Sequence, residues 1–464
     1  MAKSLHAVMV PYPAQQGSNN PLMQLAHLLS ARGFFITFVD TEGSHRRMLN
    51  ARGHAHQHNV AQGFRFTTLP DGFAAEHEGR FDSDVLEKHL VASLSKNVPP
   101  ITCIITESFV HCTHQVDLNL RLPRVVFWTY CAAASITQFK AELLLSRAYI
   151  PVKLEEAKRP ENVITCLPGN LPPLLPTDLN SFYRFDNLIE SLVYQSQLQN
   201  KGDYVMVNTM EELEGREAVA ALSINGCPSV AMGPLFLPNF LAHRDVVQSG
   251  SMFAEDKRCV GCLDAQQVGS KIYVSFGRTS VKSNQQLEEI ALGLESSQHP
   301  FLWVLRKDIA QGKSAVLPHG FLERIGDRGL TVGWVPQVKV LSHPSIGAFL
   351  THGGWNSVME SISFGIPMLG WPYFADQFLN CRFVKDVWKI GMDFEGVDVD
   401  EQRFLTREEA EKGVRSIMEC EEARQRVLKL EEVTVKAVSP AGPPFLNLNK
   451  FIQDIIQIAK SFCR

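Results

Sequence analysis

Short apolar runs alternate with helix-length amphipathic stretches along most of this 464-residue chain. Such runs are typical of strands buried on both faces of a sheet, and the stretches between them are long enough to cross over to a parallel neighbour. The alternation therefore predicts an α/β protein with parallel sheets. Strands are expected over residues 5–10, 34–39, 64–68, 101–105, 124–128, 271–276, 301–305, 330–333, 346–350 and 367–370, and helices of the second half near 284–297, 355–364, 376–389 and 407–421.

A helix signal follows the first strand. Asn20 is an expected N-cap, Pro21 suits the first helical position, and Gly33 is an expected stop. Between them, leucines at three- and four-residue spacing fall on one helix face. This segment predicts one complete strand, loop and helix unit.

The alternation lapses between Gly233 and Asp256, where Pro, Asn, His and charged residues predict an interdomain linker. We expect an N-terminal domain over residues 1–235, a linker over 236–256, and a second domain over 257–445. A C-terminal helix over 446–464 is expected to pack back on the first domain. Two doubly wound, Rossmann-like domains would then face each other across a cleft, with ligands beyond the carboxyl ends of the strands.

Composition excludes several classes of function. The 45 Lys and Arg residues against 49 Asp and Glu give a formal charge of -4, so the basic excess needed to bind nucleic acid is lacking. No 18 apolar residues run together, so no membrane span is expected. The scattered cysteines favour reduced thiols, and we expect a cytoplasmic monomer. His54, His56 and His58 alternate in a polar stretch with no clear fourth ligand, so no metal site is expected.

The segment from Trp334 to Gln377 carries the strongest functional signal. The expected strand 346–350 leads to His352, and two glycines then let the backbone approach a ligand before a helix opens. Free N–H groups at that helix start, with Asn356 and Ser357 as further donors, form an anion site suited to a diphosphate.

Other residues of the same segment suit the rest of a nucleotide sugar. Glu360 can accept hydrogen bonds from two ribose hydroxyls, and Trp334 offers a flat face for stacking on a base. Asp376 and Gln377 supply acceptors and donors for sugar hydroxyls. Each residue alone also fits a buried Trp, a core His or a capped helix, and it is the ordered set that favours a nucleotide-sugar pocket.

These 44 residues are similar, at full length and in register, to the signature box of plant secondary-product glycosyltransferases, the UDP-dependent members of glycosyltransferase family 1. The resemblance implies the GT-B fold, in which two Rossmann-like domains face each other and the C-terminal one holds the donor. It extends over most of the chain through Pro11-Tyr12-Pro13-Ala14-Gln15, Leu69-Pro70-Asp71-Gly72, Phe127-Trp128-Thr129, Asn208-Thr209, Glu212-Leu213-Glu214, Gly233-Pro234 and Tyr273-Val274-Ser275-Phe276-Gly277.

The resemblance also implies roles for single residues. The nucleotide would be bound by Ser280, Trp334, Val335, Gln337, His352, Trp355, Asn356, Ser357 and Glu360, with Trp334 on uracil, the Val335 backbone at its edge, and Glu360 on ribose. The sugar would meet Thr129, Trp355, Asp376 and Gln377. A Trp and a Gln at positions 355 and 377 go with UDP-glucose, so glucose is the expected donor sugar. No metal and no separate cofactor are expected, because the helix start neutralises the diphosphate.

The chain departs from the family where a general base is expected. Ser18 stands where the family carries its catalytic His, and Glu107 stands where an Asp orients that His. Three hypotheses stay open. Glu107 accepts the proton directly or through Ser18 or water, with its pKa raised by burial; or His111, one helical turn after Glu107, rebuilds the pair, with His114 a weaker candidate; or the acceptor is already acidic, a phenol or carboxylate.

Arg278 is a further departure, because the family usually continues with Ser there. Its guanidinium would stabilise the leaving diphosphate or else point to solvent. The sequence thus predicts an inverting UDP-glucose-dependent transferase acting on a small phenolic or flavonoid-like acceptor. The alternatives are an inactive UDP-sugar-binding protein and a transferase restricted to acidic acceptors. A nicotinamide-dependent oxidoreductase shares the strand pattern but needs a glycine fingerprint that the chain lacks.

Overall fold

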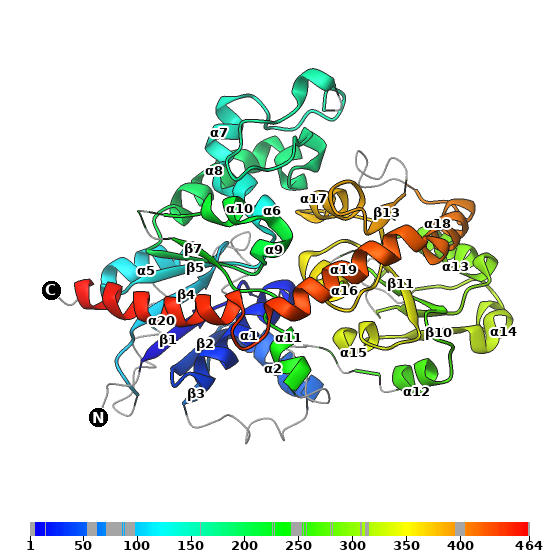
Figure 1. Cartoon of the computed structure of the whole chain (residues 1–464), viewed down its shortest axis with the longest axis horizontal. Helices are drawn as coiled ribbons and strands as arrows, with labels where there is room; N and C mark the ends of the chain where they lie inside the picture. Colours follow the sequence, from blue (N-terminus) through cyan, green and yellow to red (C-terminus); the bar gives the residue numbers. More distant parts are fainter. Residues whose placement is uncertain are drawn as a thin grey trace.

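The computed structural model describes residues 5–13, 15–52, 63–70, 86, 88, 98–157, 159–224, 226, 228–242, 253, 255–256, 258–278, 280, 282–306, 309–310, 315–394 and 404–462. His54, His56 and His58 lie outside these ranges. Two parallel sheets, each flanked by helices, stand side by side (Figure 1). The predicted fold class is confirmed by this arrangement.

The first sheet has seven parallel strands in the order β3-β2-β1-β4-β5-β6-β7. Five of them were predicted from the alternation of apolar runs. The last two were missed: β7 has only three residues, whereas β6 is an apolar run as long as the predicted strands β9 and β10. The strands are β1 His6–Val10, β2 Phe35–Thr41, β3 Phe64–Leu69, β4 Cys103–Glu107, β5 Arg124–Trp128, β6 Tyr204–Val207 and β7 Ser229–Ala231.

The second sheet has six parallel strands in the order β10-β9-β8-β11-β12-β13. Five were predicted, and β13 was missed because it is a three-residue edge strand. In both sheets the sequence order reverses beside the first strand of the sheet, which is where ligands bind in doubly wound folds. The strands are β8 Lys271–Ser275, β9 Phe301–Val304, β10 Gly329–Val332, β11 Ile346–Thr351, β12 Met368–Gly370 and β13 Gly391–Asp393.

The helices include all those predicted, with differences at their ends. The segment predicted as one helix over 376–389 is α17 followed by a π-helical turn, Phe383–Val387. The helices are α1 Gln16–Ala31, α2 Glu42–Arg52, α5 Thr113–Leu120, α6 Ala132–Phe139, α7 Ala141–Ser146, α8 Asp186–Gln199, α9 Glu211–Glu214, α10 Arg216–Ala220, α11 Leu237–Ala242, α12 Arg258–Asp264, α13 Asn284–Ser297, α14 Phe321–Ile325, α15 Gln337–Leu341, α16 Trp355–Ser363, α17 Gln377–Arg382, α18 Arg407–Glu419, α19 Glu421–Ala437 and α20 Pro443–Phe462.

The predicted start of the first helix is wrong. Helix α1 begins at Gln16 rather than after Asn20, so Pro21 lies inside it. A proline in a helix has no N–H for the carbonyl four residues earlier, which here belongs to Gly17. The early start also places Ser18 in the first turn of a helix.

Helix α20 joins the C-terminal end of the chain to the first sheet. It runs from the second half of the molecule back across the first (Figure 1). Leu448, Phe451 and Ile455 are buried in the core of the first sheet, and Asp454 accepts a 3.1 Å hydrogen bond from the hydroxyl of Tyr204. The chain thus closes on its first half, while the domain boundaries given above stay predictions.

Candidate active site

One cavity of about 800 Å³ opens between the two halves, at the carboxyl ends of both sheets. Residues from both halves line it, so the site is complete only when the two sheets stand together. Every predicted site residue except Ser280 is among them: Ser18, Glu107, His111, Thr129, Arg278, Trp334, Val335, Gln337, His352, Trp355, Asn356, Ser357, Glu360, Asp376 and Gln377.

Glu107 ends strand β4, and its residue surface is only 1% exposed. Its carboxylate accepts hydrogen bonds from the Phe109 amide at 2.8 Å, the Ser108 hydroxyl at 3.0 Å and the Thr129 hydroxyl at 3.3 Å. Burial raises the pKa of Glu107 to about 7, and the three donors oppose that shift. A carboxyl group with such a pKa can both accept and release a proton near neutrality.

Ser18 lies at the cavity through the first turn of α1. Its hydroxyl oxygen accepts a 2.9 Å hydrogen bond from the backbone amide of Tyr12. That contact ties the first turn of the helix to the end of strand β1. The hydrogen bonds of Glu107 go to three other residues and none to Ser18, so relay through Ser18 stays a hypothesis.

The prediction that His111 lies one helical turn after Glu107 is wrong. Glu107 is the last strand residue, a turn follows, and helix α5 begins only at Thr113. His111 still lines the cavity, with its ring 6.5 Å from that of Phe109. His114 is not among the lining residues, and its Nδ1 lies 3.4 Å from Oδ1 of Asp117. Burial lowers the pKa of His114 to about 4.

His352 follows strand β11 and is held between two glycines. A Cβ atom on Gly277 or Gly354 would lie 2.6 Å from the nearest imidazole atoms, so both positions require glycine. Burial, with the positive charges of Lys282 and Arg306, lowers the pKa of His352 to about 4. The imidazole is therefore neutral near pH 7. Its Nδ1 is buried and has no hydrogen-bond partner among the described residues.

The start of helix α16, which was predicted to bind an anion, lies at the cavity. Ser357 lines the cavity within its first turn, beside Asn356. The Asn356 amide nitrogen donates a 3.0 Å hydrogen bond to the Gly17 carbonyl, and its oxygen accepts from Asn208 at 3.4 Å. Both contacts cross from the C-terminal half to the N-terminal half. Asn356 therefore links the two sheets as well as facing the cavity.

Gln337 connects Glu360, predicted to hold ribose, with Ser357, predicted to meet the diphosphate. Its Nε2 donates to Glu360 at 2.7 Å and to Ser357 at 3.0 Å, while its Oε1 accepts from Tyr273 at 3.1 Å. Burial raises the pKa of Glu360 to about 7, and the bond from Gln337 opposes it. The side-chain amide of Gln337 thus fixes both the Glu360 carboxylate and the Ser357 hydroxyl, which the sequence analysis had considered separately.

Trp334 lies at the nucleotide end with one ring against another aromatic residue. The centroids of Trp334 and Phe253 are 4.7 Å apart and tilted by 34°. The Arg278 guanidinium lies over the ring of Phe253, 5.5 Å from its centroid. Arg278 lines the cavity. This position contradicts the alternative in which its side chain points only to solvent.

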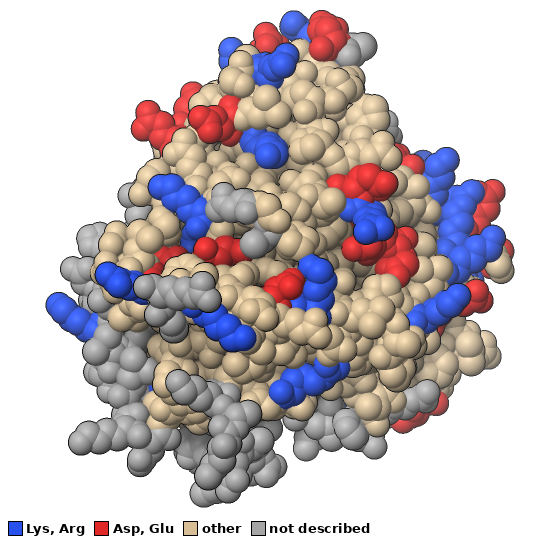
Figure 2. Space-filling view, turned by 60° about the vertical axis from the view of Figure 1, so that its left-hand side comes forward, with Lys and Arg blue, Asp and Glu red and all other residues tan. Residues whose placement is uncertain are grey.

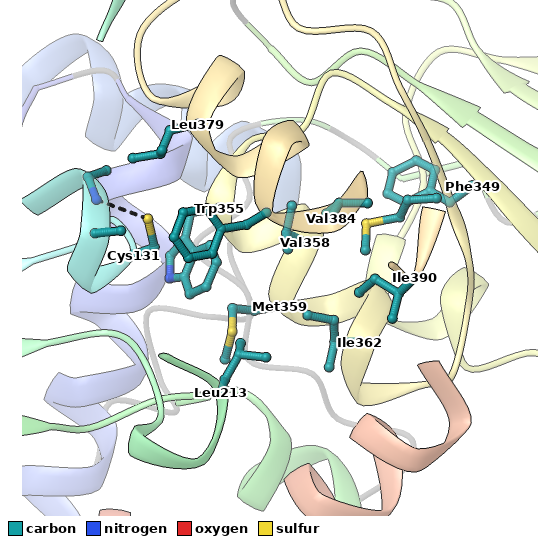
Figure 3. Packing of buried hydrophobic residues seen from close by; sticks show 14 of the residues in the cluster. Cys131, Leu213, Phe349, Trp355, Val358, Met359, Ile362, Leu379, Val384 and Ile390 are labelled. Carbon is teal, nitrogen blue, oxygen red and sulfur yellow. Dashed lines mark hydrogen bonds between the residues drawn. The ribbon is translucent and has the colours of Figure 1, made fainter. Parts of the chain in front are cut away.

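Trp355 lines the cavity, and its indole also contributes to the contact between the two halves. The ring is buried in the core between the two halves, near Cys131, Leu379 and Met359 (Figure 3). Its Nε1 donates a 2.7 Å hydrogen bond to the carbonyl of Asn208. The indole N–H is therefore not available to a sugar hydroxyl, and the ring serves the contact between the halves.

Asp376 and Gln377 lie where β12 leads into α17. Asp376 accepts a 2.8 Å hydrogen bond from Asn380, and burial raises the pKa of its carboxyl group to about 6. The Gln377 Oε1 accepts from the backbone amides of Tyr373 at 2.8 Å and Phe374 at 3.2 Å. These bonds leave the Gln377 NH₂ group as the end that can meet a ligand.

Ser280 lies behind the cavity wall. It is fully buried, and its hydroxyl has no hydrogen-bond partner among the described residues. Its carbonyl accepts a 2.9 Å bond from Arg306. A contact with a diphosphate would require this loop to move.

The far end of the cavity lies mostly on the N-terminal side, where the variable segment 180–200 was expected to contribute to an acceptor pocket. Aromatic side chains and one face of helix α8 line it, with polar and leucine residues at helical spacing. No motif marks these positions, although the 3.6-residue periodicity of α8 could have suggested an exposed stripe. The residues are Tyr12, Phe109, Tyr130, Phe182, Phe374, Asn187, Leu188, Ser191, Leu192 and Gln195.

With this geometry in hand, comparisons with known proteins are decisive. Residues 263–440 match the family described as UDP-glucoronosyl and UDP-glucosyl transferase. The chain is 36% identical to linamarin synthase 1 of Manihot esculenta, over 98% of this chain and 97% of that protein. The chain belongs to the family 1 UDP-glycosyltransferases of plants. The family and the enzyme class that the sequence predicted are thereby confirmed.

Other family members agree with this assignment. The chain is 34% identical to (R)-mandelonitrile beta-glucosyltransferase of Prunus dulcis, over 97% of each protein. Its fold matches that of Phytolacca americana UGT2 complexed with UDP-2fluoro-glucose and pterostilbene, with a TM-score of 0.78, 27% identity, and coverage of 98% of this chain and 100% of that one. A transferase from Siraitia grosvenorii in complex with UDP matches with the same TM-score, 26% identity, and coverage of 97% and 100%.

The surface of this glycosyltransferase carries both signs of charge. Basic and acidic side chains are interspersed over the face shown in Figure 2, without one continuous basic patch. Among the described helices, none is both long and apolar enough to cross a bilayer. No group of three or more potential metal ligands occurs among the described residues.

Proposed function

We propose that this glycosyltransferase transfers glucose from UDP-glucose to a hydroxyl of a small, neutral, lipophilic acceptor, with inversion at the anomeric carbon and with Glu107 as the base. The single observation that carries the proposal is the buried Glu107 carboxylate. It lies in the same cavity as the Trp334 to Gln377 residues that suit a UDP-sugar.

The donor part of the proposal rests on the C-terminal side of the cavity. Trp334 is available for uracil, and Glu360, fixed by Gln337, for ribose hydroxyls. Neutral His352 and the start of α16 offer donors to the diphosphate without a metal ion. Glucose is supported by the names of the relatives, which include (R)-mandelonitrile beta-glucosyltransferase and a 7-deoxyloganetin glucosyltransferase of Catharanthus roseus.

In the proposed step, Glu107 takes the proton of the acceptor hydroxyl. The acceptor oxygen forms a bond to the anomeric carbon as the bond from that carbon to the phosphate oxygen breaks, and UDP leaves with the electron pair. The charge that develops on the diphosphate is stabilised by the N–H groups of α16, by His352 and by the Arg278 guanidinium. Thr129 holds the Glu107 carboxylate from the side where the sugar is expected.

The acceptor is expected to be neutral because of the charged side chains that line the cavity. Glu107 and Asp376 are both acidic and would repel a carboxylate. Among the described lining residues, the two cations, Arg278 and Lys339, belong to the C-terminal half, away from the acceptor end. The aromatic residues there suit a flat or phenolic acceptor, the class predicted from the sequence. Cytoplasmic location and a monomeric state stay predictions.

A panel assay tests this function. Wild type, Glu107→Gln and the exposed control Glu212→Gln are supplied with UDP-glucose and with phenols, alkyl alcohols and carboxylic acids, while UDP binding is followed by calorimetry. We expect transfer to neutral hydroxyls by wild type and the control, and loss of nearly all turnover in Glu107→Gln with UDP affinity kept. UDP binding without transfer by wild type would indicate an inactive binding protein, and transfer to acids alone would indicate the acidic-acceptor alternative.

A further inference from the structure

Lys282 lies inside a cage of aromatic rings. It follows the cavity-lining loop after β8, and only 7% of its surface is exposed. Its Nζ atom lies 3.6 Å from the ring centroid of Trp371, 4.7 Å from that of Tyr373 and 5.9 Å from that of Phe276. Cations over aromatic faces at such distances are attracted, most strongly when water is excluded.

The three rings come from two different walls of the donor site. Phe276 directly precedes Gly277 and Arg278, which line the cavity on the diphosphate side. Trp371 and Tyr373 follow strand β12 and lead to Asp376 and Gln377 on the sugar side. The Phe276 and Trp371 rings pack edge-to-face with centroids 5.3 Å apart, and the ammonium group adds a contact that also reaches Tyr373.

The sugar-side loop transmits this contact directly to Gln377. The backbone amide of Tyr373 donates to Gln377 Oε1 at 2.8 Å, so the segment that carries the caged ring also orients this amide. A shift of Tyr373 would therefore displace the side chain proposed to read the sugar. Uracil and ribose are expected at Trp334 and Glu360, neither of which supplies a ring to the cage.

The charge of Lys282 is costly where it stands. Burial lowers the pKa of its ammonium group to about 7, so the charged form prevails only below that pH, and no carboxylate forms an ion pair with Lys282 among the described residues. A methionine of similar length would fill the cage without that desolvation cost. We therefore expect the ammonium group to contribute what an apolar side chain cannot, namely electrostatic attraction to three aromatic rings at once.

We propose that Lys282 is a positioning residue for the hexose half of the donor. Its ammonium group clamps the Phe276 loop to the Trp371–Tyr373 loop, and so holds Asp376 and Gln377 at the distance from the diphosphate site that a bound hexose requires. The proposal rests on the proposed use of UDP-glucose. It makes Lys282 more important for binding of the hexose than for binding of the nucleotide, toward which its charge acts only near His352.

The test compares UDP with UDP-glucose in the same variants by calorimetry. Lys282→Met removes the charge and keeps the chain length, and Lys282→Arg keeps the charge. We expect Lys282→Met to weaken UDP-glucose binding by about tenfold while UDP binding changes less than twofold, and Lys282→Arg to restore most of the difference. Equal losses for both ligands, or no loss for either, would overturn the proposal.

A matched control separates positioning from general destabilisation. Lys271 is also buried, and its Nζ donates to Cys262 Sγ at 3.1 Å at the start of β8, the end of the strand away from the cavity. Lys271→Met should leave the ratio of the two affinities unchanged. If Lys282→Met does not fold, Tyr373→Leu replaces it as the test. Tyr373→Leu removes one ring of the cage from a half-buried position and should shift the ratio of the UDP-glucose and UDP affinities. Absence of UDP-glucose binding by wild type would instead count against the proposed function.

Discussion

The side-chain amide of Asn356 donates a 3.0 Å hydrogen bond to the backbone carbonyl of Gly17. This carbonyl is the one that would accept the N–H of residue 21 if α1 were a regular helix. Residue 21 is a proline and has no N–H. An irregularity in the first helix of the N-terminal half therefore supplies the acceptor that docks helix α16 of the C-terminal half.

Pro21→Ala should weaken this docking. The new N–H of residue 21 would compete with Asn356 for the Gly17 carbonyl, and one neutral hydrogen bond is worth about 0.5–1.5 kcal/mol net. We expect kcat/KM for UDP-glucose to fall by roughly twofold to tenfold. The temperature of thermal unfolding should not fall, because the helix gains a bond. An unchanged kcat/KM would show that the contact has no part in donor use.

The rate should depend on pH through Glu107. Because burial raises the pKa of this carboxyl group to about 7, it is mostly protonated below that pH and cannot accept the proton of the acceptor. We expect kcat, measured at saturating donor, to rise as the pH increases through about 7. The pKa of His352 is lowered to about 4, so that residue cannot produce the same rise.

Glu107→Gln should lack this rise and have a low rate at every pH, whereas His111→Ala should keep both the rate and the profile. The opposite result, a flat profile in His111→Ala and a normal one in Glu107→Gln, would make His111 the base. His111 lines the same cavity, so this comparison decides between the two sequence-based hypotheses.

The sequence predicted the sheets well because their strands are buried on both faces, which leaves uninterrupted apolar runs. The same signal is weak for β7 and β13, whose three residues each include few large apolar side chains, and β6 was missed although it is an apolar run. It also misplaced the start of α1, because Pro21 after Asn20 is a good helix start on local grounds alone. The helix instead begins at Gln16, because the residues of its first turn make tertiary contacts with the end of β1 and with α16.

The candidate site was predictable where a motif lies in one segment. Trp334, His352, Glu360 and Gln377 all line the cavity as predicted, although their roles are untested. The cage around Lys282 was not predictable, because its rings are supplied by residues about 90 positions further along the chain as well as by the neighbouring strand. The contact of the Trp355 indole with Asn208 likewise depends on how the two halves meet.

Gln337→Leu should reduce the affinity for UDP. The substitution removes the donor to Glu360 and Ser357, so a buried carboxylate would lose its hydrogen-bond partner. Such a loss costs about 1–3 kcal/mol, which corresponds to a roughly 5-fold to 150-fold weaker UDP complex by calorimetry. Gln298→Leu, at an exposed position after α13, is the control and should bind UDP normally. Unchanged UDP affinity in Gln337→Leu would exclude Glu360 from the ribose site.

Phe451→Ala should destabilise the whole chain by detaching α20. The Phe451 ring is fully buried in the core of the first sheet, and its centroid lies 5.3 Å from that of Tyr204 in an edge-on arrangement. Truncating a buried phenylalanine costs about 3–5 kcal/mol. Leu446 lies on the same helix and is 58% exposed, so Leu446→Ala should change the free energy of unfolding by no more than about 0.5 kcal/mol. Denaturant unfolding measures both, and equal midpoints for the two variants would mean that α20 contributes little to holding the first half of the fold.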